Sequence, residues 1–70
     1  MRFIMIETIE NQAEAINPSY ISNVAIIEDA RGTYVGLFMA SGILVRTKFT
    51  NIQHAIDYIQ RAPSVSLGEQ

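Results

Sequence analysis

The sequence predicts an α+β fold, in which a mainly antiparallel sheet of about four strands carries one C-terminal helix on one face. Apolar runs rich in β-branched and aromatic residues recur over residues 2–48, and one amphipathic helical pattern follows at residues 50–62. Short connections pair neighbouring strands antiparallel, and a helix packed on such a sheet gives a two-layer domain. We therefore expect one domain over residues 1–62 and a flexible tail over residues 63–70.

The N-terminal part is expected to contain one strand, a break and one helical turn. Residues 2–9 are rich in Ile and Phe, which predicts the first strand. Residues 13–16 form a run that is too short to assign from its pattern. Asn17 is a favoured N-cap residue and Pro18 has a φ that suits the first helical position, so one helical turn should follow.

Three further strands are expected to form a meander. The β-branched run over residues 24–29 predicts the second strand, residues 33–39 the third and residues 43–48 the fourth. The connections at residues 30–32 and 40–42 are short and each contains a glycine, which suits hairpin turns. Connections of this length place consecutive strands side by side.

The strongest signal in the chain is an amphipathic helix that ends at Ala62. Thr50 is expected as its N-cap, with Gln53 three residues later at the spacing of a capping box. Pro63 has no amide hydrogen and disfavours helical geometry in the residue before it, so the helix should stop there. The apolar residues fall on one stripe at helical spacing: Ile52, Ala55, Ile56, Ile59 and Ala62. The helix therefore has one face to bury against the sheet.

The third and fourth strands carry apolar side chains on both faces of the predicted sheet. Alternation along the strands predicts which side chains face the helix: Val35, Leu37, Met39, Ile43, Val45 and Thr47. The opposite face contains the predicted partner-binding residues: Tyr34, Phe38, Leu44, Arg46 and Lys48. Two interpretations of this second face remain open. Either it binds a partner, or residues 13–20 cover it and make it part of the core.

Composition favours association over an isolated monomer. Hydrophobic residues make up 49% of the 70-residue chain and charged residues only 17%, although a small domain has a large surface to hydrate. The chain has no cysteine, so neither a disulfide nor a thiolate metal site can stabilise the core. Oligomerisation is a common remedy at this size, and we therefore expect a homo-oligomer.

Charge and hydropathy predict a cytoplasmic protein without membrane contact. The formal net charge is −2 and the isoelectric point is about 5.1, which does not favour non-specific binding to nucleic acid or anionic lipid. No apolar run reaches the roughly 20 residues that a membrane-spanning helix needs. The apolar N-terminal segment is followed at once by Glu7 and Glu10, so it is interpreted as a strand and not as a signal peptide.

No residue pattern predicts catalysis, a metal site or a cofactor. His54 is the single histidine and lies off the apolar stripe of the helix, which is typical of a solvated surface residue. One alternative to a protein partner stays open. Arg46 and Lys48 beside Tyr34 could bind an anionic small molecule, a nucleotide or nucleic acid, because cations and an aromatic ring suit phosphates and bases.

A short series of motifs runs from the helical turn to the helix: Ile16-Asn17-Pro18, then Ile21 and Val24, two strands that turn on Gly42, and a capped helix with Ala55-Ile56 and Tyr58-Ile59. From Ile16 to Gln60 this layout resembles the small bacterial FlbD-type flagellar regulators. The resemblance implies a non-enzymatic regulator that acts through protein contacts, and it supplies no catalytic residue. We therefore expect a non-catalytic regulatory protein of bacterial or phage type, an inhibitor for example, which binds a protein partner through its sheet face or edge.

Overall fold

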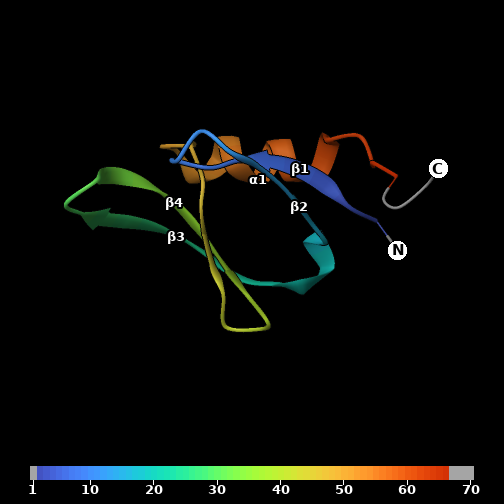
Figure 1. Ribbon diagram of the computed structural model, residues 1–70, viewed down its shortest axis with the longest axis horizontal. Helices are drawn as coiled ribbons and strands as arrows, with labels where there is room; N and C mark the ends of the chain where they lie inside the picture. The colour runs from blue at the N-terminus through green and yellow to red at the C-terminus, as the bar shows by residue number, and fades with distance from the viewer. Residues whose placement is uncertain (1, 67–70) are drawn as a thin grey trace.

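The computed structural model describes residues 2–66 and has an α+β architecture with antiparallel strands throughout, which confirms the predicted fold class (Figure 1). The elements in chain order are β1 (Ile4–Glu7), β2 (Ala13–Ile16), the 3-10 helix η1 (Pro18–Tyr20), β3 (Ile21–Asp29), β4 (Gly32–Met39), β5 (Leu44–Arg46) and α1 (Ile52–Arg61). They form a two-stranded sheet, β1-β2, and a three-stranded sheet, β3-β4-β5. The described part thus contains one strand more than the sequence predicts.

The additional strand is β2, which pairs with β1 in a separate hairpin. Ile4 lies opposite Ile16, and Glu7 lies opposite Ala13. The connection between the two strands places Asn11 at a φ of 63°, a conformation that asparagine tolerates better than most residues. The segment over residues 13–16 was too short to assign because four residues show no decisive pattern without their partner strand.

The β1-β2 hairpin is joined to the larger sheet where β1 and β5 end. Thr8 and Thr47 form an isolated antiparallel bridge. The backbone N–H of Ile9 donates to the carbonyl oxygen of Arg46 at 3.0 Å. The hairpin therefore lies beside β5, and Figure 1 shows β1, β2 and α1 together on one side while the β3-β4 hairpin extends beyond them at one end.

The meander of β3, β4 and β5 confirms the predicted order of these three strands. Val24 lies opposite Leu37 on β4, which lies opposite Val45 on β5. The single helical turn η1 is also confirmed, and its N-cap Asn17 accepts a hydrogen bond from the backbone N–H of Ser19 at 2.9 Å. Strand β3 starts earlier than predicted, directly after η1, with a register shift in its first residues.

Helix α1 begins one residue later than expected, since its N-cap is Asn51 and not Thr50. The Asn51 side-chain oxygen accepts a hydrogen bond from the backbone N–H of His54 at 3.0 Å. Asparagine ranks above threonine as an N-cap residue, which accounts for the shift. The predicted end is confirmed, because Ala62 is the C-cap.

The C-terminal end of α1 is held by Arg2. Its guanidinium donates to the carbonyl oxygens of Ile59 at 3.2 Å and Ala62 at 2.7 Å. These carbonyls lie where the helix leaves its last oxygens without intrahelical partners, and a cation is favoured there. Farther on, the N–H of Val65 donates to the carbonyl oxygen of Phe3 at 2.9 Å. Residues 67–70 of the predicted flexible tail, which spans residues 63–70, lie outside the described residues.

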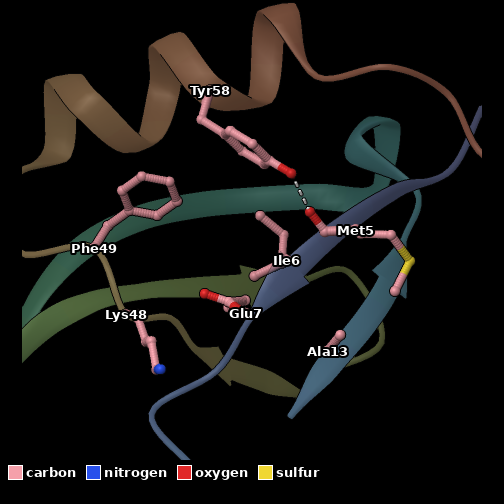
Figure 2. A pocket seen from close by; sticks show the side chains of 7 residues that line it. All are labelled: Met5, Ile6, Glu7, Ala13, Lys48, Phe49 and Tyr58. Carbon is pink, nitrogen blue, oxygen red and sulfur yellow. Dashed lines mark hydrogen bonds between the residues drawn. The ribbon is translucent and has the colours of Figure 1, made fainter. Parts of the chain in front are cut away.

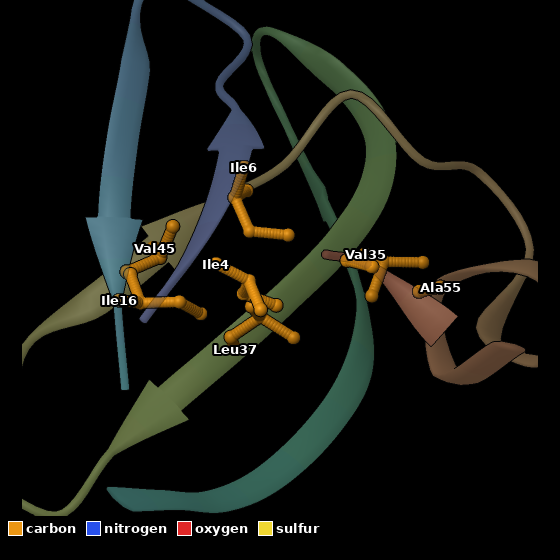
Figure 3. Packing of buried hydrophobic residues seen from close by; sticks show 8 residues of the cluster. Ile4, Ile6, Ile16, Val35, Leu37, Val45 and Ala55 are labelled. Carbon is orange, nitrogen blue, oxygen red and sulfur yellow. The ribbon is translucent and has the colours of Figure 1, made fainter. Parts of the chain in front are cut away.

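The hydrophobic core lies between the inner face of the larger sheet, the β1-β2 hairpin and α1 (Figure 3). Its buried members are Ile4, Ile6, Ile16, Val35, Leu37, Val45, Ala55 and Ala62. The helix-facing assignment is thus confirmed for Val35, Leu37 and Val45. It is wrong for Ile43, which is 62% exposed, because this residue precedes β5 in the turn and lies beyond the packed part of the sheet.

The position of Ile16 in this core also decides between the two interpretations of the outer sheet face. Ile16 packs with Leu37 and Val45 on the helix side of the sheet. The segment over residues 13–20 therefore lies on the inner side and does not cover the outer face. Within residues 2–66, no helix is long and apolar enough to cross a membrane.

Candidate functional site

Four of the five predicted partner-binding residues lie on the outer face of the larger sheet. Gly36 lies opposite Ala25 and Arg46, and Phe38 lies opposite Asn23 and Leu44, so these side chains form rows across the three strands. Phe38, Leu44 and Arg46 are half-buried, and Tyr34 is only 2% exposed. Alternation along the strands gave the correct face for these four residues, but it could not indicate that Tyr34 is buried.

A chain of hydrogen bonds ties Tyr34 into this face. Its hydroxyl donates to the Asp29 Oδ2 at 2.6 Å and accepts from the Arg46 Nε at 3.0 Å. The backbone N–H of Arg31 donates to the other Asp29 oxygen at 2.8 Å. The positive charge of Arg46 therefore already has a carboxylate within the same network, which weakens this face as a site for an added anion.

The same network shifts the ionisation of two of its members. The hydrogen bond from Tyr34, followed by that from the Arg31 backbone, holds the pKa of Asp29 below its usual range. Desolvation of the phenol, followed by its hydrogen bond to Asp29, raises the pKa of Tyr34 above its usual range. The network is therefore complete only at pH values between the pKa of Asp29 and the pKa of Tyr34.

Tyr34→Phe should reduce the acid sensitivity of folding. The lowered pKa of Asp29 stabilises the fold above its unfolded pKa of about 4, and this contribution is lost as pH falls through the folded pKa. The variant lacks the hydroxyl that is the main cause of the shift. Urea unfolding midpoints measured from pH 2 to pH 7 should therefore fall more steeply with acid in the wild type than in Tyr34→Phe.

Tyr20→Phe is the matched control, because it removes the same atom from a ring that is 56% exposed. The urea unfolding midpoint of Tyr20→Phe should fall with acid in the same way as that of the wild type. The raised pKa of Tyr34 predicts a second effect, a loss of stability as pH rises from about 10 toward the folded pKa, which Tyr34→Phe abolishes. If the unfolding midpoints of the wild type and Tyr34→Phe change in parallel with pH in both the acid and the alkaline range, this role of the network is contradicted.

Apolar side chains close over the centre of the outer face. A Cβ placed on Gly36 would lie 2.8 Å from Ile27 Cγ1 and 2.9 Å from Leu44 Cδ1. Glycine is therefore required here by space, and the two neighbouring side chains fill the position that a larger residue would occupy. Ile27 and Leu44 therefore cover the centre of the outer face, and less apolar area remains for a partner than the sequence suggested.

Lys48, the fifth predicted residue, lies elsewhere. It lines a pocket of about 320 Å³, together with Met5, Ile6, Glu7, Ala13, Phe49 and Tyr58 (Figure 2), and none of the other four predicted residues lines this pocket. The Tyr58 hydroxyl donates to the carbonyl oxygen of Met5 at 2.6 Å, and the Phe49 and Tyr58 rings lie 5.5 Å apart. The phenol is thus already engaged, and the pocket offers mainly apolar surface with one cation and one anion at its edge.

A larger groove of about 620 Å³ lies between η1, β2 and the turn that joins β4 to β5. Its apolar lining includes Phe3, Ile16, Tyr20, Met39, Ile43 and Val45. Tyr20 and Ile43 are 56% and 62% exposed, so two large side chains remain in contact with water at this groove. Glu14 is the one carboxylate among the described residues that line it, and no lysine, arginine or histidine is among them.

The free edge of β3 is a second exposed feature. Among residues 2–66, no backbone hydrogen bond joins this edge to another element. The strand spans nine residues and carries no charge from Ile21 to Ile27. Ile26 is 41% exposed. A long uncharged edge strand is a template for pairing with another chain, and most proteins protect such an edge with charge or proline.

Within residues 2–66, no three His, Asp or Glu side chains lie close enough together to hold a metal ion. The side chain of His54 is exposed at the start of α1, where its backbone N–H serves the helix cap.

Sequence reasoning did not find the groove, because its walls come from three segments that are distant in the chain. Tyr20 was interpreted only as part of a helical turn, and Ile43 was assigned to the buried face. The one signal that pointed here was the apolar stretch around the β4-β5 turn, which the chain has too little material to cover.

Comparisons with protein-family models, with curated proteins and with solved structures gave no match to this chain. The resemblance to FlbD-type regulators therefore stays a prediction. Function has to be inferred from the surfaces described above: the closed outer face, the small pocket beside Tyr58, the apolar groove and the free edge of β3.

Proposed function

We propose that this chain is a non-catalytic regulatory protein that binds a protein partner and works as a homo-oligomer. The observation that carries the proposal is the apolar groove with Tyr20 and Ile43 exposed at 56% and 62%. Burying a large apolar side chain contributes about 1.5–3 kcal/mol, so two such residues on a concave surface favour binding. A protein that binds without transforming its partner acts by occupying a surface of that partner, as a regulator or inhibitor does.

The lining of the groove suggests what the partner presents. The apolar walls suit one or two large apolar side chains, and Glu14 suits a lysine or arginine beside them. The formal net charge of −2 also favours a basic partner surface. We propose the cytoplasm as its compartment, since a chain without cysteine needs no oxidising environment for stability.

Ile43→Asp should abolish partner binding while the fold is kept. The substitution places a charge in the apolar groove, at a side chain that is too exposed to matter for the core. The measurement is affinity capture from an extract of the native host, with the tagged wild-type chain and two variants compared side by side. Thr33→Asp is the matched control, because it adds the same charge at an exposed position outside the groove.

Support for the proposal is a protein that the wild type and Thr33→Asp retain and that Ile43→Asp loses by about tenfold or more, a loss of about 1.4 kcal/mol in binding. A partner that Ile43→Asp still retains at wild-type levels would contradict the groove as its binding site. If no protein distinguishes the wild type from Ile43→Asp, the proposed function fails.

A further inference from the structure

We infer that the free edge of β3 pairs with β3 of a second copy, antiparallel and with the two-fold axis at Ala25. The inference rests on the proposed function in one respect, the homo-oligomer, and names the surface that forms it. Pairing of this kind would join two three-stranded sheets into one continuous six-stranded sheet. The occupant of the edge is thus a second copy of this chain.

The backbone pattern shows which groups are free on this edge. On β4, Val35 exchanges hydrogen bonds with the segment after β5, since its N–H donates to Phe49 and its carbonyl accepts from Thr47. The backbone N–H and C=O groups of odd-numbered residues in β4 therefore point toward β5, and those of even-numbered residues point toward β3. Because Gly36 lies opposite Ala25, the N–H and C=O groups of Ala25 point to β4.

The neighbours of Ala25 consequently point the other way. The backbone groups of Val24 and Ile26 face the open edge, with no hydrogen-bonding partner in residues 2–66. In an antiparallel pair centred on Ala25, Val24 of each copy lies opposite Ile26 of the other, and both N–H and both C=O groups are satisfied. The pairing thus supplies partners for the free backbone groups without disturbing the bonds to β4.

The choice of register follows from strand length and charge. Ala25 is the midpoint of β3, so this register gives the largest overlap of the two strands. It places Glu28 opposite the uncharged Ser22 of the other copy, and the two Glu28 residues lie about 20 Å apart, beyond the screening length of physiological salt. A register centred nearer the β3-β4 turn would place carboxylates opposite each other, which is unfavourable.

The side chain at the axis also fits. Ala25 would lie opposite itself in a pair without direct hydrogen bonds, where the two Cα atoms approach to about 4.5 Å and a small side chain is favoured. On the other face, Ile26 is 41% exposed and would pack beside Val24 of the second copy. The other outer edge, that of β2, is a less suitable template, because it spans four residues and carries Glu14.

Single cysteines test this register directly, because the chain contains none of its own. Ala25→Cys should oxidise to a disulfide-linked dimer, since the expected Cα separation lies within the range for disulfides. Asn23→Cys is the matched control on the same strand, since its two copies would lie about 13 Å apart and could not be bridged. On mild oxidation, we expect about tenfold more linked dimer from Ala25→Cys than from Asn23→Cys.

Ile26→Pro provides a second test. Proline removes an N–H that faces the open edge and leaves the bonds to β4 in place, so the variant should be monomeric with an unchanged circular dichroism spectrum. Ile26→Val keeps the N–H and should remain dimeric. If the proline variant does not fold, the cysteine pair still decides the question.

Failure of this inference and failure of the proposed function are distinguishable. A dimeric wild type that links equally through Asn23→Cys and Ala25→Cys, or through neither, would overturn the β3 pairing and leave the homo-oligomer intact. A monomeric wild type would overturn both the pairing and the homo-oligomer, while capture through the groove could still succeed. The wild type could instead be monomeric and capture a protein from the host extract that Ile26→Pro does not capture. In that case the edge of β3 binds that protein and the inference is wrong.

Discussion

Leu37→Ala should lower the free energy of unfolding by about 2–5 kcal/mol, the largest loss that we expect from one side chain in this chain. Leu37 is fully buried in the core cluster beside Ile4 of β1 (Figure 3), so its removal leaves a cavity in the only core that residues 2–66 contain. A domain of this length is stable by about 4–10 kcal/mol in total, so the variant should be largely unfolded near physiological temperature. Urea unfolding at fixed protein concentration measures the loss.

Ile43→Ala is the matched control for Leu37→Ala. It truncates an apolar side chain that is 62% exposed, so the free energy of unfolding should change by no more than about 0.5 kcal/mol. Equal losses in the two variants would show that Leu37 does not lie at the centre of the core.

Gly36→Val should cost about 2–3 kcal/mol of stability, the second largest effect, through overpacking on the outer face. Even the first added carbon would lie 2.8 Å from Ile27 and 2.9 Å from Leu44, so both side chains have to move. Urea unfolding again measures the effect.

Two comparisons show whether crowding is the cause of the loss in Gly36→Val. Thr33→Val places the same valine side chain at an exposed position of β4 and should change stability by no more than about 0.5 kcal/mol. Ile27→Ala makes room beside position 36, so the combined variant should lose less than the sum of the two single variants. Simple additivity would mean that Ile27 and position 36 do not compete for space.

The elements that the sequence predicted well are those whose signal is local. The stripe of α1 repeats at helical spacing over residues 52–62, and Pro63 marks its end. The β3-β4-β5 meander follows from glycine-containing turns between β-branched runs. Strand β2 was not predicted, because it becomes a strand through pairing with β1, and no feature of its four residues indicates this.

The surfaces were predicted less well, because exposure depends on what packs nearby. Alternation placed Tyr34 on the outer face, but it could not indicate that the ring is buried there or that its hydroxyl is hydrogen-bonded to Asp29 at the end of β3. Beyond the end of β5, Thr47 is still buried as alternation predicts, whereas Lys48 lines the pocket beside Tyr58 and not the outer face. Ile43 had the correct parity for the inner face, yet the turn carries it out of the core.

The molar mass of the chain in solution tests the central claim, that this chain works as a homo-oligomer. Light scattering at micromolar concentration should give twice the chain mass of 7.8 kDa for the wild type and a single chain mass for Ile26→Pro. A wild type that remains at 7.8 kDa at the highest concentration reached would contradict the claim.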